Sequence, residues 1–458
     1  MFVGRKTEQL ELKNFLSGRG QAALVYGRRR IGKTSLIKHV ISASDDSCFM
    51  FFEAIEGSYE SNLMSFTRLA AQKLDVPLGS YPDFLSLFSF IAASGKALVI
   101  IIDEYQYLKL SRKEYSVDSE FKQIIDNIPS GIKLILSGSY ITIMKELLAE
   151  ENPLFGRFSL IMNLKELNYL ESQEFYSNKS NYEKVCFYSV FGGCPYILEH
   201  IDPDASLEEN IVSLLVNENS VARSYIEYVL FKETGKANTL NEVLSALGNS
   251  KKRYSQIESE LNMKSNGLLS TYLKQLIDMN LITTSVPINK RDDKKKVSYM
   301  IKDNLVRFYY AYVFKNRSLI QNLTVSDFLA SYISPSLNTF ISYRFEGIVM
   351  DYLRQNASSI ENEPVLNIGS YWYDDPSTKT NGEFDVVVQY ASHYSVYEVK
   401  FYTKPMSKAE IEKEAGKIRR IKELAPVKIG FVSAAGFEVQ DSDYIYLTSD
   451  DIYQSNHR

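Results

Sequence analysis

The sequence predicts an α/β protein with several domains, and three observations support this fold class. Short, wholly apolar runs alternate with helical patterns in the first part of the chain, as is typical of a parallel sheet. Helical patterns followed by a charged hairpin pattern occupy the middle of the chain. A second α/β segment begins at about Phe340. At 458 residues, the chain is also too long for one ordinary hydrophobic core.

The composition indicates a soluble globular protein, with 45% hydrophobic and 24% charged residues. The net charge of −4 gives no whole-chain argument for nucleic-acid binding. The 3 cysteines lie far apart, which fits a reducing compartment and argues against a disulfide framework or a zinc site. The amino terminus lacks a signal pattern, and the longest apolar runs are much shorter than a membrane span. We therefore expect a cytoplasmic protein with no membrane partner.

The first part of the chain predicts a parallel sheet covered by helices on both faces. The expected strands are Ala22–Tyr26, Cys48–Phe52, Ala97–Ile102, Ile132–Leu136 and Ser159–Leu164. Between them, Leu63–Leu74 and Phe121–Ile128 carry apolar residues at helical spacing. In such a sheet, a nucleotide binds at the carboxyl ends of the strands.

A phosphate-binding loop follows the first expected strand. Gly27–Thr34 matches the pattern G-x-x-x-x-G-K-[ST] in full. The glycines let the backbone N–H groups face phosphate oxygens, Lys33 reaches the β- and γ-phosphates, and the Thr34 hydroxyl ligates Mg²⁺. The three consecutive arginines of the loop could also retain ADP and slow turnover. We expect ATP and Mg²⁺ as cofactors, and nucleotide contacts from Gly27, Arg28, Arg29, Arg30, Ile31, Gly32, Lys33, Thr34 and Ser35.

Two acidic residues follow the apolar run Ala97–Ile102. Asp103 would hold the hydrated Mg²⁺, and Glu104 would polarise the attacking water. The alternative interpretation is a helix-capping acid after a core strand.

Two further residues are candidates for the ATPase reaction. Ser139, after the strand Ile132–Leu136, could contact the γ-phosphate or the attacking water as a sensor, or it could be an ordinary strand-ending residue. Arg157 could be an arginine finger, acting in its own chain or on a neighbouring subunit of a homo-oligomer. The alternative for Arg157 is a surface arginine after a turn.

Five amino-terminal segments form a specific set: Phe2–Glu8, Gly27–Thr34, the Ile-Ile-Asp-Glu strand, Leu-Ser-Gly-Ser and Phe191–Pro195. Together they resemble the archaeal-type P-loop ATPases, which also occur in bacteria and are grouped with the AAA+ and STAND NTPases. The resemblance spans roughly residues 1–235, and we expect an ATPase core over 1–165 and a helical lid over 166–235. It implies that Val3, Gly4 and Arg5 lie near the adenine and that Pro195 lies against the nucleotide. From the residues alone, the Gly-Gly-x-Pro segment is only a turn.

The middle of the chain, residues 236–302, predicts a winged helix. Its expected helices, strands and hairpin tip are Leu240–Leu247, Tyr254–Leu261, Ser265–Met279, Leu281–Val286, Asn289–Lys296 and Val297–Ile301. Polar residues suited to phosphates and base edges are Lys264, Ser265, Asn266, Ser270, Thr271 and Lys274. The tip has five basic residues against two acids and could lie along a DNA backbone. Alternatively, the winged helix is a lid that reports nucleotide state, and its tip is simply solvated.

After a helical connector over residues 303–339, residues 340–458 predict a final α/β domain. Its expected elements are a helix at Phe345–Arg354, strands at Phe384–Tyr390, Tyr394–Val399 and Val427–Val432, and a helix near Lys408–Leu424. The last of these helices carries a basic strip that could face phosphates or be an ordinary charged surface. The strip consists of Lys408, Lys413, Lys417, Arg419, Arg420 and Lys422.

Four residues of this last domain suit metal-assisted phosphodiester cleavage. Glu398 and Lys400 share one face of their strand, and a hairpin turn near Ala391–His393 would bring Asp385 next to them. Asp385 and Glu398 could bind Mg²⁺, while Lys400 could orient or deprotonate water. With Glu346 upstream, the set resembles the PD-(D/E)xK nucleases and implies a restriction-endonuclease-like domain, although no proline precedes Asp385. Alternatively, Lys400 only neutralises Glu398 in a salt-bridged strand pair.

The sequence therefore predicts an ATP-binding and ATP-hydrolysing protein of the AAA+/STAND type that depends on Mg²⁺. Its nucleotide state would control DNA binding or cleavage by the nuclease-like domain. The main alternative is a STAND-like switch that binds protein partners and has an inactive nuclease fold. A third interpretation is a plain DNA-binding ATPase.

Overall fold

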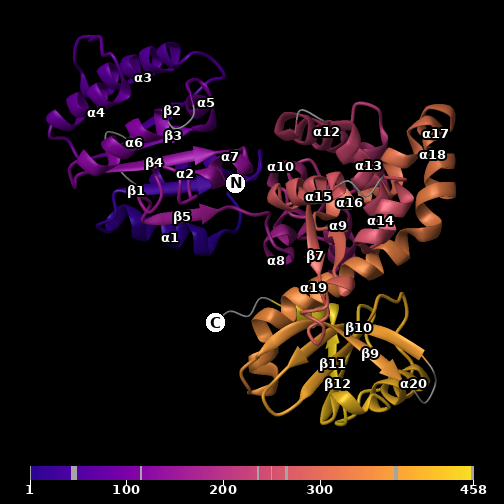
Figure 1. Cartoon of the computed structure of the whole chain (residues 1–458). Coiled ribbons are helices and arrows are strands. Elements are labelled where there is room, and N and C mark those ends of the chain that lie inside the picture. Colours follow the sequence, from indigo (N-terminus) through magenta and orange to yellow (C-terminus); the bar gives the residue numbers. More distant parts are fainter. Residues whose placement is uncertain are drawn as a thin grey trace. The chain divides into compact units, whose positions relative to one another are not determined.

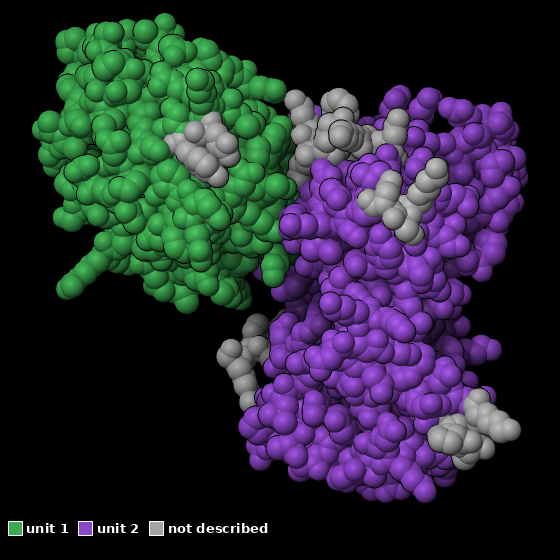
Figure 2. Space-filling view, in the orientation of Figure 1, with its two compact units in different colours: residues 1–167, 194–196 green, residues 168–193, 197–458 purple. Residues whose placement is uncertain are grey.

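The computed structural model describes residues 2–42, 49–113, 116–234, 237–248, 250–263, 267–375 and 380–454. The chain divides into two compact units (Figure 2): Met1–Leu167 with Cys194–Tyr196, and Asn168–Gly193 with Ile197–Arg458. Among the described residues, no helix is both long and apolar enough to cross a membrane. Four residues considered above lie outside the described part, namely Cys48, Lys264, Ser265 and Asn266.

The first unit contains a five-stranded parallel sheet, as predicted. Its strands are β1 (Ala22–Tyr26), β2 (Phe49–Glu53), β3 (Leu98–Asp103), β4 (Ile132–Gly138) and β5 (Leu160–Asn163). They lie in the order β2-β3-β4-β1-β5. Successive residues of β1 pack on opposite faces, with Leu24 in one buried cluster and Val25 in the other. The strands are apolar throughout because both faces of the sheet are covered.

Two groups of helices supply this cover. Residues of α1 (Lys6–Ser17) and α2 (Lys33–Ile41) belong to the cluster that contains Val25. The other cluster draws on α3 (Tyr59–Leu74), α4 (Phe84–Ala93), α5 (Gln106–Leu110), α6 (Ser116–Asn127) and α7 (Ile141–Glu146). Because α2 begins at Lys33, within the phosphate-binding loop that follows β1, its amino terminus lies at the carboxyl edge of the sheet (Figure 1).

The second unit opens with short helices and a winged helix, as predicted. The short helices are α8 (Tyr169–Ser172), α9 (Asn181–Phe191), α11 (Leu207–Ile211) and α12 (Val221–Thr234), and α10 (Pro195–Leu198) is divided between the two units. The winged helix comprises α13 (Ala237–Leu247), β6 (Lys252–Arg253), α14 (Tyr254–Glu260), α15 (Leu268–Asp278), β7 (Ile282–Ser285) and β8 (Ser298–Ile301). Its strands form a small antiparallel sheet in the order β6-β8-β7.

A long helix leads into the last part of the second unit. The short helices α16 (Asn304–Phe308), α17 (Arg317–Asn322) and α18 (Val325–Phe328) precede α19 (Ser334–Glu361), which runs across the boundary expected at residues 339 and 340. The elements that follow are β9 (Asn367–Asp375), β10 (Thr380–Gln389), β11 (Tyr394–Lys400), α20 (Lys408–Arg419), β12 (Val427–Ser433), β13 (Ile445–Thr448) and α21 (Ser449–Tyr453). The strands form a mixed sheet in the order β13-β12-β11-β10-β9.

This mixed sheet confirms the predicted final α/β domain. The pairs β9–β10 and β10–β11 are antiparallel, whereas β11–β12 and β12–β13 are parallel. Residues of α20 share a buried cluster with the sheet, and α19 contacts β9, β10 and β11. Figure 1 shows α19 running onto this sheet.

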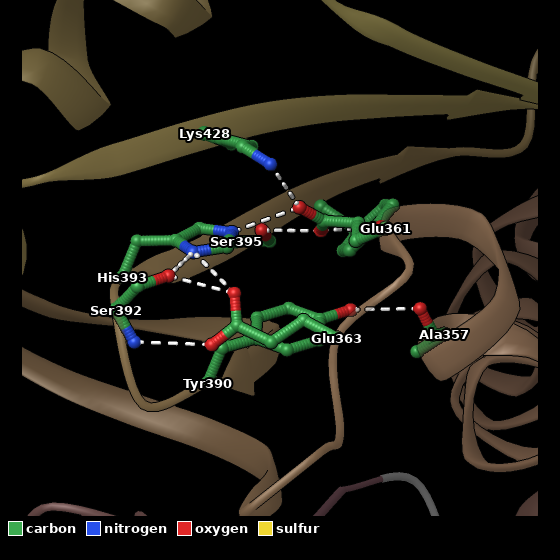
Figure 3. A network of polar contacts seen from close by, with 9 residues as sticks. Ala357, Glu361, Glu363, Tyr390, Ser392, His393, Ser395 and Lys428 are labelled. Carbon is green, nitrogen blue, oxygen red and sulfur yellow. Dashed lines mark hydrogen bonds and ion pairs between the residues drawn. The ribbon is translucent and has the colours of Figure 1, made fainter.

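A buried polar network fixes the carboxyl end of α19 to the sheet (Figure 3). The Glu361 carboxylate, 2% exposed, accepts hydrogen bonds from Ser395 Oγ at 2.5 Å and Lys428 Nζ at 2.9 Å. His393 Nε2 lies 2.8 Å from the same carboxylate. Desolvation opposes ionisation of Glu361, but these partners outweigh it and lower its pKa. Because α19 also carries Glu346, this network helps to position Glu346 on the sheet.

Candidate functional site

The phosphate-binding loop adopts a backbone that its glycines permit. Gly32, directly before α2, has a φ of 94°, a conformation that L side chains rarely adopt. A Cβ on Gly27 would lie 2.3 Å from the carbonyl oxygen of Leu164, so only glycine fits there. The Lys33 ammonium donates hydrogen bonds to the carbonyls of Gly27 at 2.9 Å and Arg28 at 3.0 Å. The Lys33 side chain therefore lies over the backbone of the loop, as the motif requires.

Thr34 and Asp103 meet at this loop. The Thr34 hydroxyl donates a hydrogen bond of 2.6 Å to Asp103 Oδ2. Asp103 is the last residue of β3 and is 4% exposed. A hydroxyl and a carboxylate at this edge are hard oxygen groups of the kind that Mg²⁺ binds, so the residues present fit the expected ion.

Glu104 is held in a polar network next to Asp103. Its φ of 53° turns the chain sharply after β3, and its Oε2 accepts a hydrogen bond of 2.6 Å from Ser139 Oγ. Gln106, which is fully buried, donates to the same carboxylate oxygen and, at 3.2 Å, to Ser139 Oγ. Arg29 forms an ion pair of 3.6 Å with the other oxygen of Glu104. The structure thus brings the expected base and the expected sensor together.

Gln106 is a site residue that the sequence analysis missed. A lone glutamine at the start of a short helix belongs to no motif. In the fold, β3 and β4 lie side by side, and Gln106 bridges Glu104 and Ser139 at their ends.

The three loop arginines all have protein partners. Arg28 pairs with Glu166, Arg29 pairs with Glu104, and the Arg30 guanidinium lies 4.0 Å from the ring centroid of Tyr196. These contacts give each arginine a role in the loop that requires no phosphate. The proposal that the three charges retain ADP therefore gains no support from their contacts.

The amino-terminal segment also contacts the loop. The buried Arg5 guanidinium donates hydrogen bonds to the carbonyls of Ile31 at 2.7 Å and Lys165 at 2.8 Å. Arg5 itself has a φ of 58°, and the preceding Gly4 has a φ of 68°. Arg5 therefore ties the segment Val3–Arg5 to the loop, next to the site where the nucleotide is expected.

The remaining expected contact residues lie around the loop. A Cβ on Gly32 would lie 3.9 Å from Pro195 Cγ, which places Pro195 against the loop. Ile31 is buried in the core beside α2, whereas Ser35 is exposed on α2.

Arg157 lies near the amino-terminal edge of the parallel sheet, opposite the edge that carries the phosphate-binding loop. Its guanidinium forms an ion pair of 2.7 Å with Asp126 near the end of α6. Two residues further on, Ser159 bonds to Ala22, the first residue of β1. The loop follows the other end of β1, so these contacts give no support to an action of Arg157 on its own nucleotide. An action on a neighbouring subunit stays a prediction.

In the second unit, a β-bulge sets the position of Asp385. The register between β10 and β9 shifts between Phe384 and Val387, where β10 carries one extra residue. In the β10–β11 pair, Val386 lies opposite Tyr397. Asp385 therefore lies one residue beyond this pair, at the level of the next residue of β11, Glu398.

Cations accompany these two carboxylates. Lys400 Nζ lies 2.6 Å from Glu398 Oε1. Lys251, just before β6 of the winged helix, lies 2.9 Å from Glu383 and 3.4 Å from Asp385. Desolvation lowers the pKa of Lys251, but the two acids outweigh it and hold the pKa above its ordinary value. Lys251 could not be predicted from the sequence, because no motif links it to a strand more than 100 residues away.

Glu346 on α19 belongs to the same electrostatic cluster. Burial, together with the charge of Asp385, raises the pKa of Glu346 to about 8, while Lys251 and Arg307 oppose the shift. Desolvation also raises the pKa of Asp385, and Lys251 opposes this. Within the described part of the chain, no three His, Cys, Asp or Glu side chains converge as metal ligands. The cluster thus offers at most a pair of carboxylates to one ion, which suits Mg²⁺ because Mg²⁺ commonly takes one or two carboxylates and completes its shell with water.

The wing tip contacts β9, the edge strand of the mixed sheet. The Ile288 N–H donates a 2.7 Å hydrogen bond to the carbonyl of Ser370. Asn289 and Trp372 exchange two hydrogen bonds, of 2.7 and 3.0 Å, and the Lys296 ammonium lies 3.1 Å from the Trp372 ring centroid. The tip was expected to be free for DNA or simply solvated, and instead part of it covers a sheet edge.

Comparison with known proteins gives the first unit a family. Residues 2–201 match the family model of an ATPase domain predominantly from Archaea. The amino-terminal part of this chain belongs to the archaeal-type P-loop ATPases. It is a nucleotide-binding ATPase domain. Residues 309–414 of this ATPase match a family model of archaeal and bacterial proteins of unknown function.

The chain is also similar to a curated relative and to solved structures. An uncharacterized protein of Methanocaldococcus jannaschii is 29% identical over 380 residues, covering 81% of this chain and 82% of the relative. The Walker-type ATPase of Pyrococcus abyssi has the same fold, with a TM-score of 0.50 at 19% identity, over 68% of this chain and 96% of that chain. The ORC2 protein of Aeropyrum pernix gives a TM-score of 0.43 at 15% identity, over 71% and 95% of the two chains.

Proposed function

We propose that this ATPase depends on Mg²⁺ and that its nucleotide state controls DNA binding or cleavage at the carboxylates of the second unit. The observation that carries the cleavage proposal is the position of Asp385 beside Glu398, with Lys400 next to them. Like charges on neighbouring strands destabilise a sheet. Two carboxylates in this arrangement therefore need positive charge beside them, which a bound metal ion would supply together with Lys400.

In the ATPase half, each residue has a distinct role. Lys33 binds the β- and γ-phosphates, and Thr34 and Asp103 hold the ion. Glu104 accepts a proton from the attacking water or polarises it, and Ser139 fixes the Glu104 carboxylate through its hydroxyl. When bound, Mg²⁺ neutralises charge on the β- and γ-phosphates.

In the second unit, Asp385 and Glu398 hold the ion, and Lys400 acts on the attacking water. Lys400 is bound to Glu398 at 2.6 Å, so its ammonium is fixed next to a carboxylate that would hold the ion. When bound, Mg²⁺ acts as a Lewis acid on the phosphoryl oxygen. Glu346, whose pKa of about 8 keeps a proton available near neutral pH, is the candidate proton donor to the leaving oxygen.

A plasmid-cleavage assay tests the second activity. The full chain is incubated with supercoiled plasmid and Mg²⁺ or Mn²⁺, alongside Asp385→Ala and Lys400→Ala. We expect cleavage by the wild type and a loss of about 100-fold in each variant. Lys404→Ala, which removes an exposed lysine after β11, is the matched control and should cleave at the wild-type rate.

The second candidate function is a STAND-like switch that binds protein partners and has an inactive nuclease fold. The ion pairs Lys400–Glu398 and Lys251–Asp385 favour it, because they neutralise both acids within the protein. If the wild type cleaves no DNA in any nucleotide state, the switch becomes the better account.

A further inference from the structure

Lys251 connects the winged helix to the candidate cleavage site. It precedes β6 in the sequence, whereas its carboxylate partners Glu383 and Asp385 lie on β10. The ammonium lies 2.9 Å from one carboxylate and 3.4 Å from the other. A positive charge from the winged helix is therefore placed against the carboxylate that would bind a metal ion.

The neighbouring lysine shows that this placement is specific to Lys251. Lys252 has the same chemistry and an adjacent position, but it pairs with Glu260 of α14, within the winged helix itself. Lys251 alone of the two reaches across to β10.

The contact of Lys251 is not isolated, because the wing tip also contacts this sheet. There, Asn289 and Lys296 hold Trp372 of β9. Because β9 and β10 are neighbouring strands, both contacts fix the winged helix along the same edge of the sheet. Lys251 thus belongs to a docked surface.

We propose that Lys251 is an internal cation that occupies the metal site of Asp385 and blocks it while the winged helix is docked on β9 and β10. This inference rests on the proposed metal site. An ammonium placed against Asp385 repels a divalent ion that approaches the same carboxylate, because both are positively charged. Metal binding and Lys251 docking therefore each weaken the other by linkage.

The geometry makes the block reversible. The Lys251 side chain is 37% exposed and that of Asp385 is 47% exposed. Ion pairs that reach solvent contribute little free energy. Movement of the winged helix can therefore remove Lys251 without leaving a buried, unpaired charge.

Mn²⁺ binding to the full, nucleotide-free chain tests the block, with electron paramagnetic resonance to count free and bound Mn²⁺. The variants are Lys251→Gln, the matched control Lys252→Gln, and Asp385→Asn to identify binding at this site. We expect Lys251→Gln to tighten the Mn²⁺ dissociation constant roughly two- to fivefold, as the loss of one exposed ion pair implies. Lys252→Gln should leave it unchanged, and Asp385→Asn should abolish the site.

Two results would overturn the inference, and they are distinguishable. If Mn²⁺ binds through Asp385 with the same affinity in wild type and Lys251→Gln, Lys251 does not block the site, although the proposed metal site stands. If neither protein binds Mn²⁺ in a way that Asp385→Asn removes, the metal site itself fails and the block fails with it. Circular dichroism of each variant confirms that its fold is intact.

Discussion

The hydroxyl of Thr34 donates a 2.6 Å hydrogen bond to Asp103, which joins the start of α2 to the end of β3. The two residues are 69 positions apart in the sequence. They meet because β1 and β3 end at the same edge of a parallel sheet, with only β4 between them. The pair supplies the oxygen atoms that the proposed ATPase reaction requires at this edge.

The first prediction concerns Asp103. Asp103→Asn keeps the size of the side chain but removes the charge that would bind the hydrated ion. We expect kcat for ATP hydrolysis to fall about 100-fold or more, as measured by phosphate release at saturating ATP and Mg²⁺. Glu150→Gln neutralises an exposed carboxylate of the same unit and should leave kcat unchanged. A wild-type kcat in Asp103→Asn would refute this assignment.

The second prediction concerns Gln106 as a positioning residue. It contacts Glu104 and Ser139 through hydrogen bonds, and we assign it no contact with the nucleotide. Gln106→Ala should therefore lower kcat about tenfold while KM for ATP changes less than about twofold. In the double variant with Ser139→Ala, the losses should be less than additive, because both side chains fix the same carboxylate. A raised KM with normal kcat would assign Gln106 to nucleotide binding instead.

The third prediction concerns the pH dependence of stability through Glu361. Its pKa is lowered in the folded protein, so its stabilising contribution is present above the unfolded value of about 4.3 and disappears as pH falls through the lower folded value. Glu361→Gln should cost about 1–3 kcal/mol at pH 7 and progressively less below about pH 4. Urea unfolding of the wild type and Glu361→Gln at pH 7 and below about pH 4 measures the difference in their free energies of unfolding.

A neighbouring carboxylate provides the comparison for this test. Glu363 accepts hydrogen bonds from Ser392, but its side chain is 25% exposed, compared with 2% for Glu361. Glu363→Gln should therefore have a smaller effect than Glu361→Gln at pH 7. Equal effects would contradict the view that the buried Glu361 holds the end of α19.

The fourth prediction uses the single tryptophan of the chain, Trp372. It contacts the wing through Asn289 and Lys296, so its fluorescence reports whether the wing is docked. Lys296→Ala should shift the emission to longer wavelength, because the ring becomes more exposed to water. Lys294→Ala, in the same tip, is the matched control. Unchanged emission in Lys296→Ala would mean that the wing does not rest on β9 in solution.

The sequence predicted those parts of the site that a local pattern encodes. The loop Gly27–Thr34 is contiguous, and the acids Asp103 and Glu104 follow a wholly apolar strand. The closeness of Asp385 to Glu398 followed from the period of two in strands and from one short turn. These relationships depend on neighbouring residues or on a single hairpin, so spacing is sufficient to reveal them.

Other features depend on contacts between distant segments, which spacing does not encode. Gln106 and Lys251 are polar residues outside any motif, and their partners come from other strands or another domain. The strands β9 and β13 were missed, as was the bulge at Asp385. β9 contains Gly369 and several polar or aromatic residues without clear alternation, and a bulge breaks the period of two that strand prediction uses.

The central claim is that nucleotide state controls DNA cleavage at Asp385 and Glu398. Its most direct test is the rate of plasmid cleavage by the full chain with ATP, with ADP and without nucleotide, in the presence of Mg²⁺. The wild type should cleave about tenfold faster in one state than in the others. Lys33→Ala should remove that difference, and Lys400→Ala should remove cleavage in every state. An equal wild-type rate in all three states, or no cleavage in any of them, would contradict the account.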